Sequence, residues 1–192
     1  MFVVDSSWKP GENQSWYHML YFVNAVVDKL RIIRRTVRVA VVRYSDTAEL
    51  TIAMNHIDHV HQLISNLSYV GDERSDLAHA LDVTRSLAFD DARSSAWRVV
   101  VVITEHLLAS PRLSAAVDDV RSSNIELIVV AVSGYGGVEF NTLSKISSET
   151  SRVDDYDRLA DKTDEVVHYI CDGKRETLTS TSTPRGKIAS SL

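Results

Sequence analysis

The sequence has 192 residues, of which 44% are hydrophobic, and a formal net charge of −5. This length and apolar content suit one globular domain with a sizeable core. The acidic net charge and the scattered basic residues, which are densest at Arg31, Arg34 and Arg35, argue against a nucleic-acid partner. Apolar runs such as Val99–Ile103 are far too short for a membrane span.

Apolar strand-like runs alternate with segments of helical periodicity along the chain. This pattern predicts an α/β fold with a doubly wound, mostly parallel central sheet and helices on both faces. The expected strands are Phe2–Val4, Arg38–Tyr44, Leu50–Met54, Arg98–Thr104 and Glu126–Val132. The expected helices are Ser15–Arg35, Ile57–Leu67, Asp76–Phe89, Arg112–Ser122, Val138–Ser147 and Arg158–Ile170.

Two features refine this topology. The runs Val99–Ile103 and Leu127–Val132 do not alternate with polar residues, so both faces of these strands are expected to be buried. The short link Ser45–Thr47 predicts an antiparallel hairpin, which places one antiparallel strand at an edge of the sheet. We expect one domain over residues 1–171 and a Ser/Thr-rich, disordered tail or linker over residues 172–192.

Two triplets have the pattern of N-glycosylation acceptors, at Asn13 and Asn66. They favour secretion, although such triplets also arise by chance. The only cysteine, Cys171, follows the last expected helix. A lone cysteine is most often an inert thiol, but in a secreted protein it suggests that a disulfide partner is missing.

The end of the first strand carries the most informative polar residues. The apolar run Phe2–Val4 delivers Asp5 and Ser7 to the edge of the sheet where α/β folds gather ligand groups. Hard divalent cations prefer carboxylate and hydroxyl oxygens of this kind. The next alternate position is Lys9, whose ammonium group only donates hydrogen bonds and has the same sign of charge as a metal. A cation site here is therefore expected to be degenerate.

Three loops would meet at this edge of the sheet: Asp5-Ser6-Ser7-Trp8-Lys9, Gly71-Asp72-Glu73-Arg74-Ser75 and Ile103-Thr104-Glu105. With the segments Val39–Asp46 and Val166–Cys171, they make the chain resemble the von Willebrand factor A domain family over about residues 2–171. The resemblance implies a Rossmann-like fold. In that family, an Asp-x-Ser-x-Ser sequence, a threonine and a second aspartate form the metal-ion-dependent adhesion site, which binds a divalent cation and leaves one position open for a carboxylate of the partner.

Carried across residue by residue, Asp5 and Ser7 match the family motif, Ser75 stands at the threonine position and Glu105 at the second aspartate position. These four residues are the expected metal ligands. Lys9 stands at the position of the second serine, so Mg²⁺ or Mn²⁺ is expected to bind weakly or not at all. The alternative is that water takes the place of the lost hydroxyl and a weak site remains.

The resemblance is to extracellular matrix A domains such as those of microfibrillar collagens and matrilins. It implies a non-enzymatic adhesion or matrix module that is secreted and binds a protein ligand, either collagen or another matrix protein. In secreted members, the cysteine after the last helix commonly pairs with one just before the first strand. Cys171 would then have its partner upstream of Met1, so we expect a truncated amino terminus and a signal peptide outside this sequence. The alternatives are an intracellular scaffold domain of a multiprotein complex and a weakly metal-dependent adhesion domain.

Other chemistries find less support in the sequence. The spacing of His56, His59 and His61 fits no common zinc site and has no cysteine nearby, so surface or packing histidines are favoured. An enzyme could use Asp5 and Glu105 as an acid and a base. No accompanying nucleophile with an orienting base is evident, and no catalytic residue is predicted.

Overall fold

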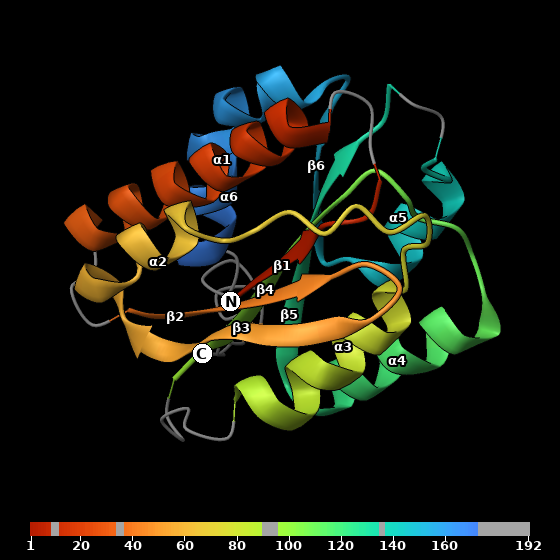
Figure 1. Ribbon diagram of the computed structural model, residues 1–192. Coiled ribbons are helices and arrows are strands. Elements are labelled where there is room, and N and C mark those ends of the chain that lie inside the picture. Colours follow the sequence, from red (N-terminus) through yellow and green to blue (C-terminus); the bar gives the residue numbers. More distant parts are fainter. Residues whose placement is uncertain (9–11, 34–36, 90–95, 135–136, 173–192) are drawn as a thin grey trace, which may run out of the picture.

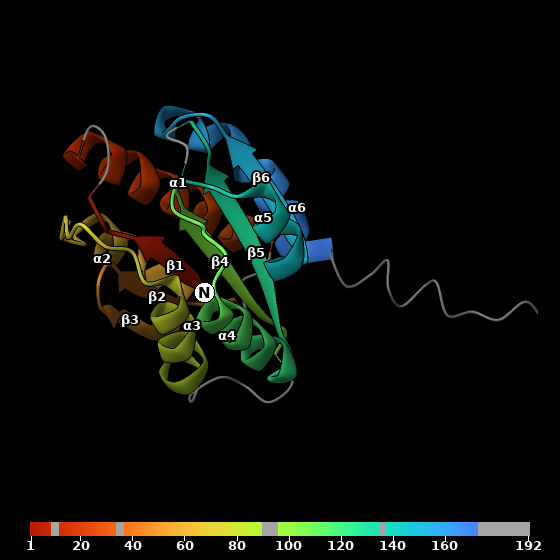
Figure 2. The ribbon, with the colours of Figure 1, turned by 90° about the vertical axis from the view of Figure 1, so that its right-hand side faces the viewer.

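The computed structural model describes residues 1–8, 12–33, 37–89, 96–134 and 137–172. Its strands are β1 (Phe2–Asp5), β2 (Arg38–Tyr44), β3 (Ala48–His56), β4 (Arg98–Thr104), β5 (Ile125–Val132) and β6 (Glu149–Val153). They form one sheet in the order β3-β2-β1-β4-β5-β6 (Figure 2). Neighbouring strands pair in parallel except β2 and β3, which form an antiparallel hairpin at one edge. The predicted α/β fold is confirmed, including its antiparallel edge strand.

Helices cover both faces of this sheet. They are α1 (Glu12–Ile33), α2 (His61–Ser65), α3 (Leu77–Val83), α4 (Pro111–Ser122), α5 (Phe140–Ile146) and α6 (Thr163–Asp172). Figure 1 shows α1 and α6 on one face and α3 and α4 on the other. None of the helices in the described ranges combines the length and the apolar character needed to cross a membrane.

The alternation of side chains along the central strands divides the core into two layers. In β1, Phe2 and Val4 pack in the layer that contains α1 and α6, whereas Val3 packs in the layer that contains α3 and α4. Every residue of Val99–Ile103 is at most 8% exposed. The predicted burial of this central strand on both faces is confirmed, and the same holds for Leu127–Val132.

The sequence patterns missed strand β6. Its five residues, Glu149–Val153, are mostly polar, and only Ser151 and Val153 are buried. As an edge strand, β6 pairs through its backbone with β5 alone, so it needs few apolar side chains and gives a weak sequence signal.

Three expected helices differ in form. The segment predicted as Ile57–Leu67 is a 3₁₀ turn, η1 (Ile57–His59), followed by α2, and the segment predicted as Asp76–Phe89 is α3 followed by a π-helical turn, η2 (Thr84–Ala88). The last predicted helix begins as a 3₁₀ helix, η3 (Tyr156–Lys162), before α6. Helical hydrogen bonding continues to Asp172, so Cys171 lies within α6 and not after it. The predicted tail spans residues 172–192, but Asp172 is the last residue of α6. Residues 173–192 lie outside the described residues.

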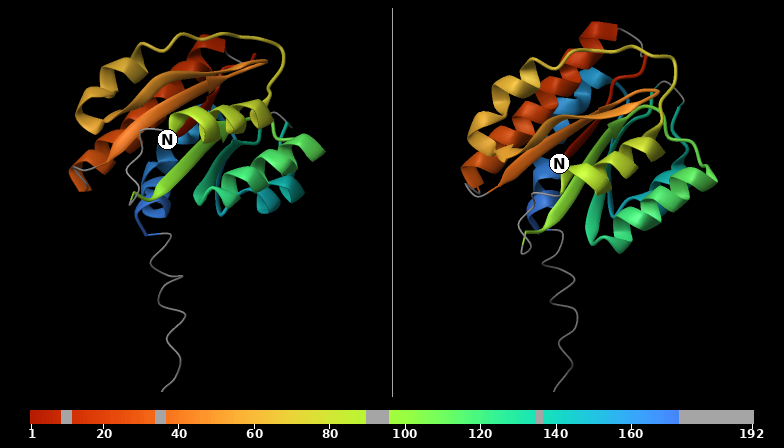
Figure 3. Two further views of the ribbon diagram at one scale, coloured as in Figure 1. Left: turned by 90° about the horizontal axis from the view of Figure 1, so that it is seen from below. Right: turned by 60° about the horizontal axis from the view of Figure 1, so that its bottom comes forward.

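The connection between α2 and α3 is important for the site. Figure 3 shows this yellow segment passing the tip of the orange β2–β3 hairpin on its way to α3. A bridge between Ser7 and Asp72 joins it to the loop that follows β1. Loops from three parts of the sequence therefore meet at the carboxyl ends of β1 and β4, which are adjacent in the middle of the sheet.

Candidate functional site

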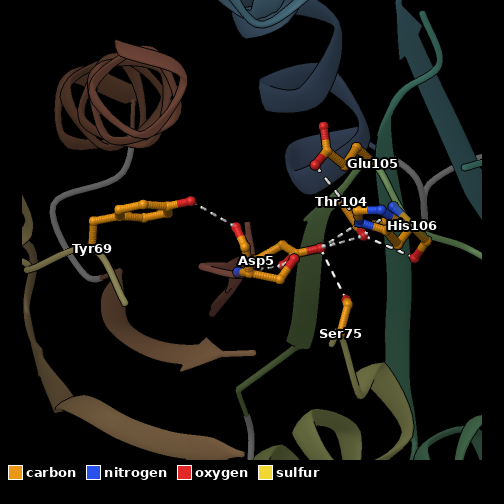
Figure 4. Close-up of polar contacts among 7 residues, drawn as sticks. Asp5, Tyr69, Ser75, Thr104, Glu105 and His106 are labelled. Atoms are coloured by element: carbon orange, nitrogen blue, oxygen red, sulfur yellow. Dashed lines mark hydrogen bonds and ion pairs between the residues drawn. The ribbon is translucent and has the colours of Figure 1, made fainter. Parts of the chain in front are cut away.

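Asp5 is the centre of a hydrogen-bond network at the end of β1, and its side chain is fully buried (Figure 4). The backbone N–H and the hydroxyl of Ser7 donate to its Oδ1 atom over 3.0 and 2.6 Å. The hydroxyls of Ser75 and Thr104 donate to its Oδ2 atom over 3.1 and 2.9 Å. One carboxylate thus joins the loop after β1, the loop before α3 and the end of β4.

Backbone contacts hold the first two of these loops together. Gly71 has a positive φ of 83°, a conformation that glycine adopts at little cost, and its N–H donates to the Ser6 carbonyl over 2.8 Å. The Trp8 N–H donates to the Asp72 carbonyl over 2.6 Å. The Tyr69 hydroxyl donates to the Ser7 carbonyl over 3.2 Å. The loop before α3 is therefore fixed against the residues that follow Asp5.

Glu105 and His106 lie beside Asp5 at the end of β4. The Glu105 side chain is 1% exposed, and His106 Nδ1 lies 3.7 Å from Glu105 Oε1 and 4.0 Å from Asp5 Oδ2. Gly137 lies close to the backbone of Glu105, and a Cβ atom added to Gly137 would lie 2.3 Å from the Glu105 carbonyl oxygen. A larger residue at position 137 would therefore collide with the end of this strand. Two buried carboxylates and one imidazole therefore converge at the end of this strand.

Two buried tyrosines respond to the negative charge of these carboxylates. Burial, followed by the charge of Asp5, raises the pKa of Tyr44 well above its usual range. Burial, followed by the charges of Glu105 and Asp5, likewise raises the pKa of Tyr156. Both phenols stay neutral at physiological pH. The base of the site is therefore a region of negative potential, which favours a bound cation.

The chemistry of the donor set fits a divalent cation. Because Ser7 and Ser75 direct their hydroxyl hydrogens to Asp5, the lone pairs on their oxygens remain available to an ion. Glu105 adds a second carboxylate to these oxygens, which are the donors that hard cations prefer. Among the described residues, no three His, Cys, Asp or Glu side chains are arranged to hold a metal by themselves. A cation here would therefore depend on the hydroxyl oxygens.

The predicted site residues are largely brought together. Asp5, Ser7 and Ser75 share one hydrogen-bond network, and Glu105 lies next to it. Lys9 is outside the residues that the structure describes.

The sequence patterns missed Thr104, His106, Tyr44, Tyr156 and Tyr69. Thr104 and His106 flank Glu105, so their position at the end of a central strand was an available signal. The three tyrosines come from distant segments and carried no local signal.

The remaining predicted residues lie elsewhere. Asn13 and Asn66 are both exposed. Cys171 is partly buried and packs against the core layer that contains α1. The rings of His56 and His59 lie 6.3 Å apart on the surface, and His61 faces Asp28 across 3.1 Å.

Comparisons with known proteins agree with this architecture. The model of the von Willebrand factor type A domain matches residues 1–165. The von Willebrand factor of Rattus norvegicus is 22% identical over 182 residues, which cover 90% of this chain and 42% of that protein. The chain thus spans less than half of this relative.

Solved structures show the same fold. Proximal thread matrix protein 1 from the mussel byssus has a TM-score of 0.77 at 14% identity, and the match covers 88% of this chain and 46% of that one. A structure of the same mussel protein has a zinc-occupied metal-ion-dependent adhesion site (MIDAS) motif. Its TM-score is 0.77 at 14% identity, and the match covers 88% of this chain and 47% of that one. A von Willebrand factor type A protein from Catenulispora acidiphila has a TM-score of 0.71 at 15% identity, with coverage of 86% and 41%. Since the family model matches most of the sequence, the chain belongs to the von Willebrand factor type A domain family.

Proposed function

We propose that this domain is a non-enzymatic adhesion or matrix module that binds a protein ligand through the loops around Asp5. The family consists of protein-interaction modules, and the relatives include von Willebrand factor and a thread matrix protein. The observation that carries the proposal is the hydrogen-bond network of Asp5, which fixes three loops at one end of the sheet. Collagen or another matrix protein is the proposed class of partner.

The same loops expose apolar side chains to solvent. Trp8 is 53% exposed on the loop after β1, Val70 is 44% exposed before α3, and Leu108 is 61% exposed after β4. Exposed aromatic and aliphatic residues around a polar centre are typical of protein-binding surfaces, where a few such residues contribute most of the affinity. A protein ligand would bury these side chains.

Within this surface, Asp5, Ser7, Ser75 and Glu105 are the proposed ligands of a degenerate metal-ion-dependent adhesion site. The zinc-occupied motif of the mussel protein supports cation binding at the corresponding place. A bound divalent ion would offer an open coordination position to a carboxylate of the partner. We propose that Mg²⁺ and Mn²⁺ bind weakly, because Lys9 replaces an oxygen ligand in the sequence and Mg²⁺ demands a nearly complete octahedral set.

An extracellular, secreted location is proposed from the same relatives. The exposure of Asn13 and Asn66 would allow glycosylation of both sites. Upstream genomic sequence tests the location. A signal peptide supports secretion, whereas an uninterrupted coding sequence without one favours an intracellular scaffold domain.

Surface plasmon resonance on immobilised fibrillar collagen and fibronectin tests the binding proposal. We expect saturable binding that Trp8→Ala weakens by about tenfold or more, as for a residue at the centre of an interface. The matched control is Tyr21→Ala, which removes a 65% exposed aromatic side chain on α1, away from these loops. Binding that Tyr21→Ala weakens and Trp8→Ala leaves intact would place the interface on a helix face. Absence of binding to both matrix proteins would refute this class of partner.

A further inference from the structure

We infer that His106 makes this site prefer Zn²⁺, a borderline divalent cation, over Mg²⁺. The inference rests on the proposed function only in that it concerns a cation at the same site. His106 is one residue beyond Glu105 and is not among the residues of the family motif.

The imidazole nitrogen Nδ1 of His106 is placed where it could bind a cation. His106 Nδ1 is buried and has no hydrogen-bond partner among the described residues, although 42% of the side chain is exposed. It lies 3.7 Å from Glu105 Oε1 and 4.0 Å from Asp5 Oδ2. Two atoms that bind one tetrahedral zinc ion at about 2.0–2.2 Å are about 3.4 Å apart, so a shift of about 0.3 Å toward Glu105, or about 0.6 Å toward Asp5, lets the imidazole and a carboxylate share one ion.

A second polar group at the same point lacks a well-formed hydrogen bond. The Tyr44 hydroxyl is buried beside Asp5, Ser75 and Thr104, yet it meets no partner in good geometry within the described part of the chain. Buried polar groups of this kind usually have a partner, such as ordered water or an ion. The site therefore contains a nitrogen and a hydroxyl that a hydrated cation would satisfy.

The backbone holds His106 in place. The Thr104 hydroxyl accepts a 3.0 Å hydrogen bond from the His106 N–H, and Leu107 pairs with Val138 in the next loop. Gly137 lies so close to the ring that an added Cβ atom would be 3.1 Å from His106 Cδ2. This support keeps Nδ1 directed toward the two carboxylates, as the groups around a metal ligand commonly do.

Mg²⁺ and Zn²⁺ prefer different sets of ligand atoms. Mg²⁺ takes oxygen ligands in a nearly octahedral arrangement, and the replacement of a serine by Lys9 removes one of them. Zn²⁺ accepts four ligands and combines imidazole with carboxylate and other oxygen donors. Divalent ions late in the first transition series also bind nitrogen-containing sites more tightly than earlier ones. The loss of an oxygen and the gain of an imidazole therefore both shift the preference toward Zn²⁺.

Calorimetric titration of the full chain with zinc chloride and with magnesium chloride tests the inference. We expect Zn²⁺ to bind at least about 100-fold more tightly than Mg²⁺, and His106→Ala to lower the zinc affinity by about tenfold or more. Co²⁺ gives an independent readout, because His106→Ala should change its visible absorption spectrum. The matched control is the double variant His56→Ala/His59→Ala, which removes two surface histidines that lie next to each other. Circular dichroism melting checks that each variant is folded.

Equal zinc affinity in the wild type and in His106→Ala would overturn the inference, as would a loss that occurs only in the His56 and His59 control. Mg²⁺ affinity equal to that of Zn²⁺ would overturn it as well. The two proposals fail separately. Absence of matrix binding with His106-dependent zinc binding intact refutes only the proposed function, and Trp8-dependent matrix binding without zinc binding refutes only this inference.

Discussion

The hydroxyl of Thr104 donates a 2.9 Å hydrogen bond to Asp5 Oδ2 and so links the ends of β4 and β1. The same oxygen accepts the N–H of His106 over 3.0 Å. Both Thr104 and Asp5 are fully buried. A single hydroxyl therefore joins the carboxylate at the centre of the site to the strand end that carries Glu105 and His106.

Replacing Thr104 by valine keeps the shape of the side chain and removes this hydroxyl. The change leaves the His106 N–H without its acceptor and removes one donor from Asp5, so we expect the free energy of unfolding to fall by about 1–3 kcal/mol. Chemical denaturation measures the loss. The control is Thr51→Val on β3, where a hydroxyl donates to the Val41 carbonyl away from the site and the loss should be about 1 kcal/mol or less. Equal losses in the two variants would contradict the special role of Thr104.

Gly71→Ala should strain the loop before α3. The residue has a φ of 83°, and an added Cβ atom would lie 3.1 Å from Tyr69 Cε1. We expect a loss of about 1–2 kcal/mol in the free energy of unfolding, because side chains other than that of glycine rarely adopt this conformation. Gly71→Asn should cost less than alanine, since asparagine tolerates a positive φ better. Alanine at wild-type stability would show that the loop adjusts without strain.

Glu165 on α6 should contribute to stability in a pH-dependent way. Burial opposes ionisation of its carboxyl group, but hydrogen bonds from Lys162 and Tyr169 outweigh it and lower the pKa of Glu165 below the ordinary value of 4.5. The contribution is therefore complete above about pH 4.5 and is lost as the pH falls through the lowered pKa. Because 32% of the side chain is exposed, solvent screening limits the effect to below about 1 kcal/mol.

Denaturation at a series of pH values tests this expectation. As the pH falls below about 4.5, the wild type should lose stability more steeply than Glu165→Gln. Glu73→Gln, which changes an exposed carboxyl group on the loop before α3, is the control and should follow the wild type. Parallel curves for the wild type and Glu165→Gln would show that the hydrogen bonds to Glu165 add no acid-sensitive stability.

If the protein is secreted, as proposed, we expect Cys171 to form a disulfide with a cysteine upstream of Met1. The cross-link would close a loop of nearly the whole domain and stabilise it by about 4–5 kcal/mol in the chain-entropy model. Alkylation of natively secreted protein under non-reducing conditions, followed by mass spectrometry, measures the state of the thiol. A Cys171 thiol that reacts freely in protein that includes the upstream residues would refute the pairing.

The parts of the fold that are buried on both sides could be predicted from sequence, because burial leaves a continuous apolar run such as Val99–Ile103. The edge strand β6 could not be predicted, since its mostly polar residues pair through the backbone with β5 alone.

The residues of the candidate site also differ in whether they could be predicted from sequence. Asp5 and Ser7 are close in sequence and were predicted together, as was Glu105 at the end of a central strand. Tyr44 and Tyr156 approach the same carboxylates from β2 and η3, and only the tertiary structure brings them there. No local spacing in the sequence encodes that contact.

We propose that the site of Asp5, Ser7, Ser75 and Glu105 is degenerate for magnesium because Lys9 and Glu105 depart from the family motif. Calorimetric titration with Mg²⁺ and Mn²⁺ of the wild type, Lys9→Ser, Glu105→Asp and the double variant is the most direct test. We expect weak or undetectable binding by the wild type, a modest gain in each single variant and the tightest binding in the double variant, where the full oxygen set is restored. Tight magnesium binding by the wild type, unchanged in the double variant, would contradict the claim.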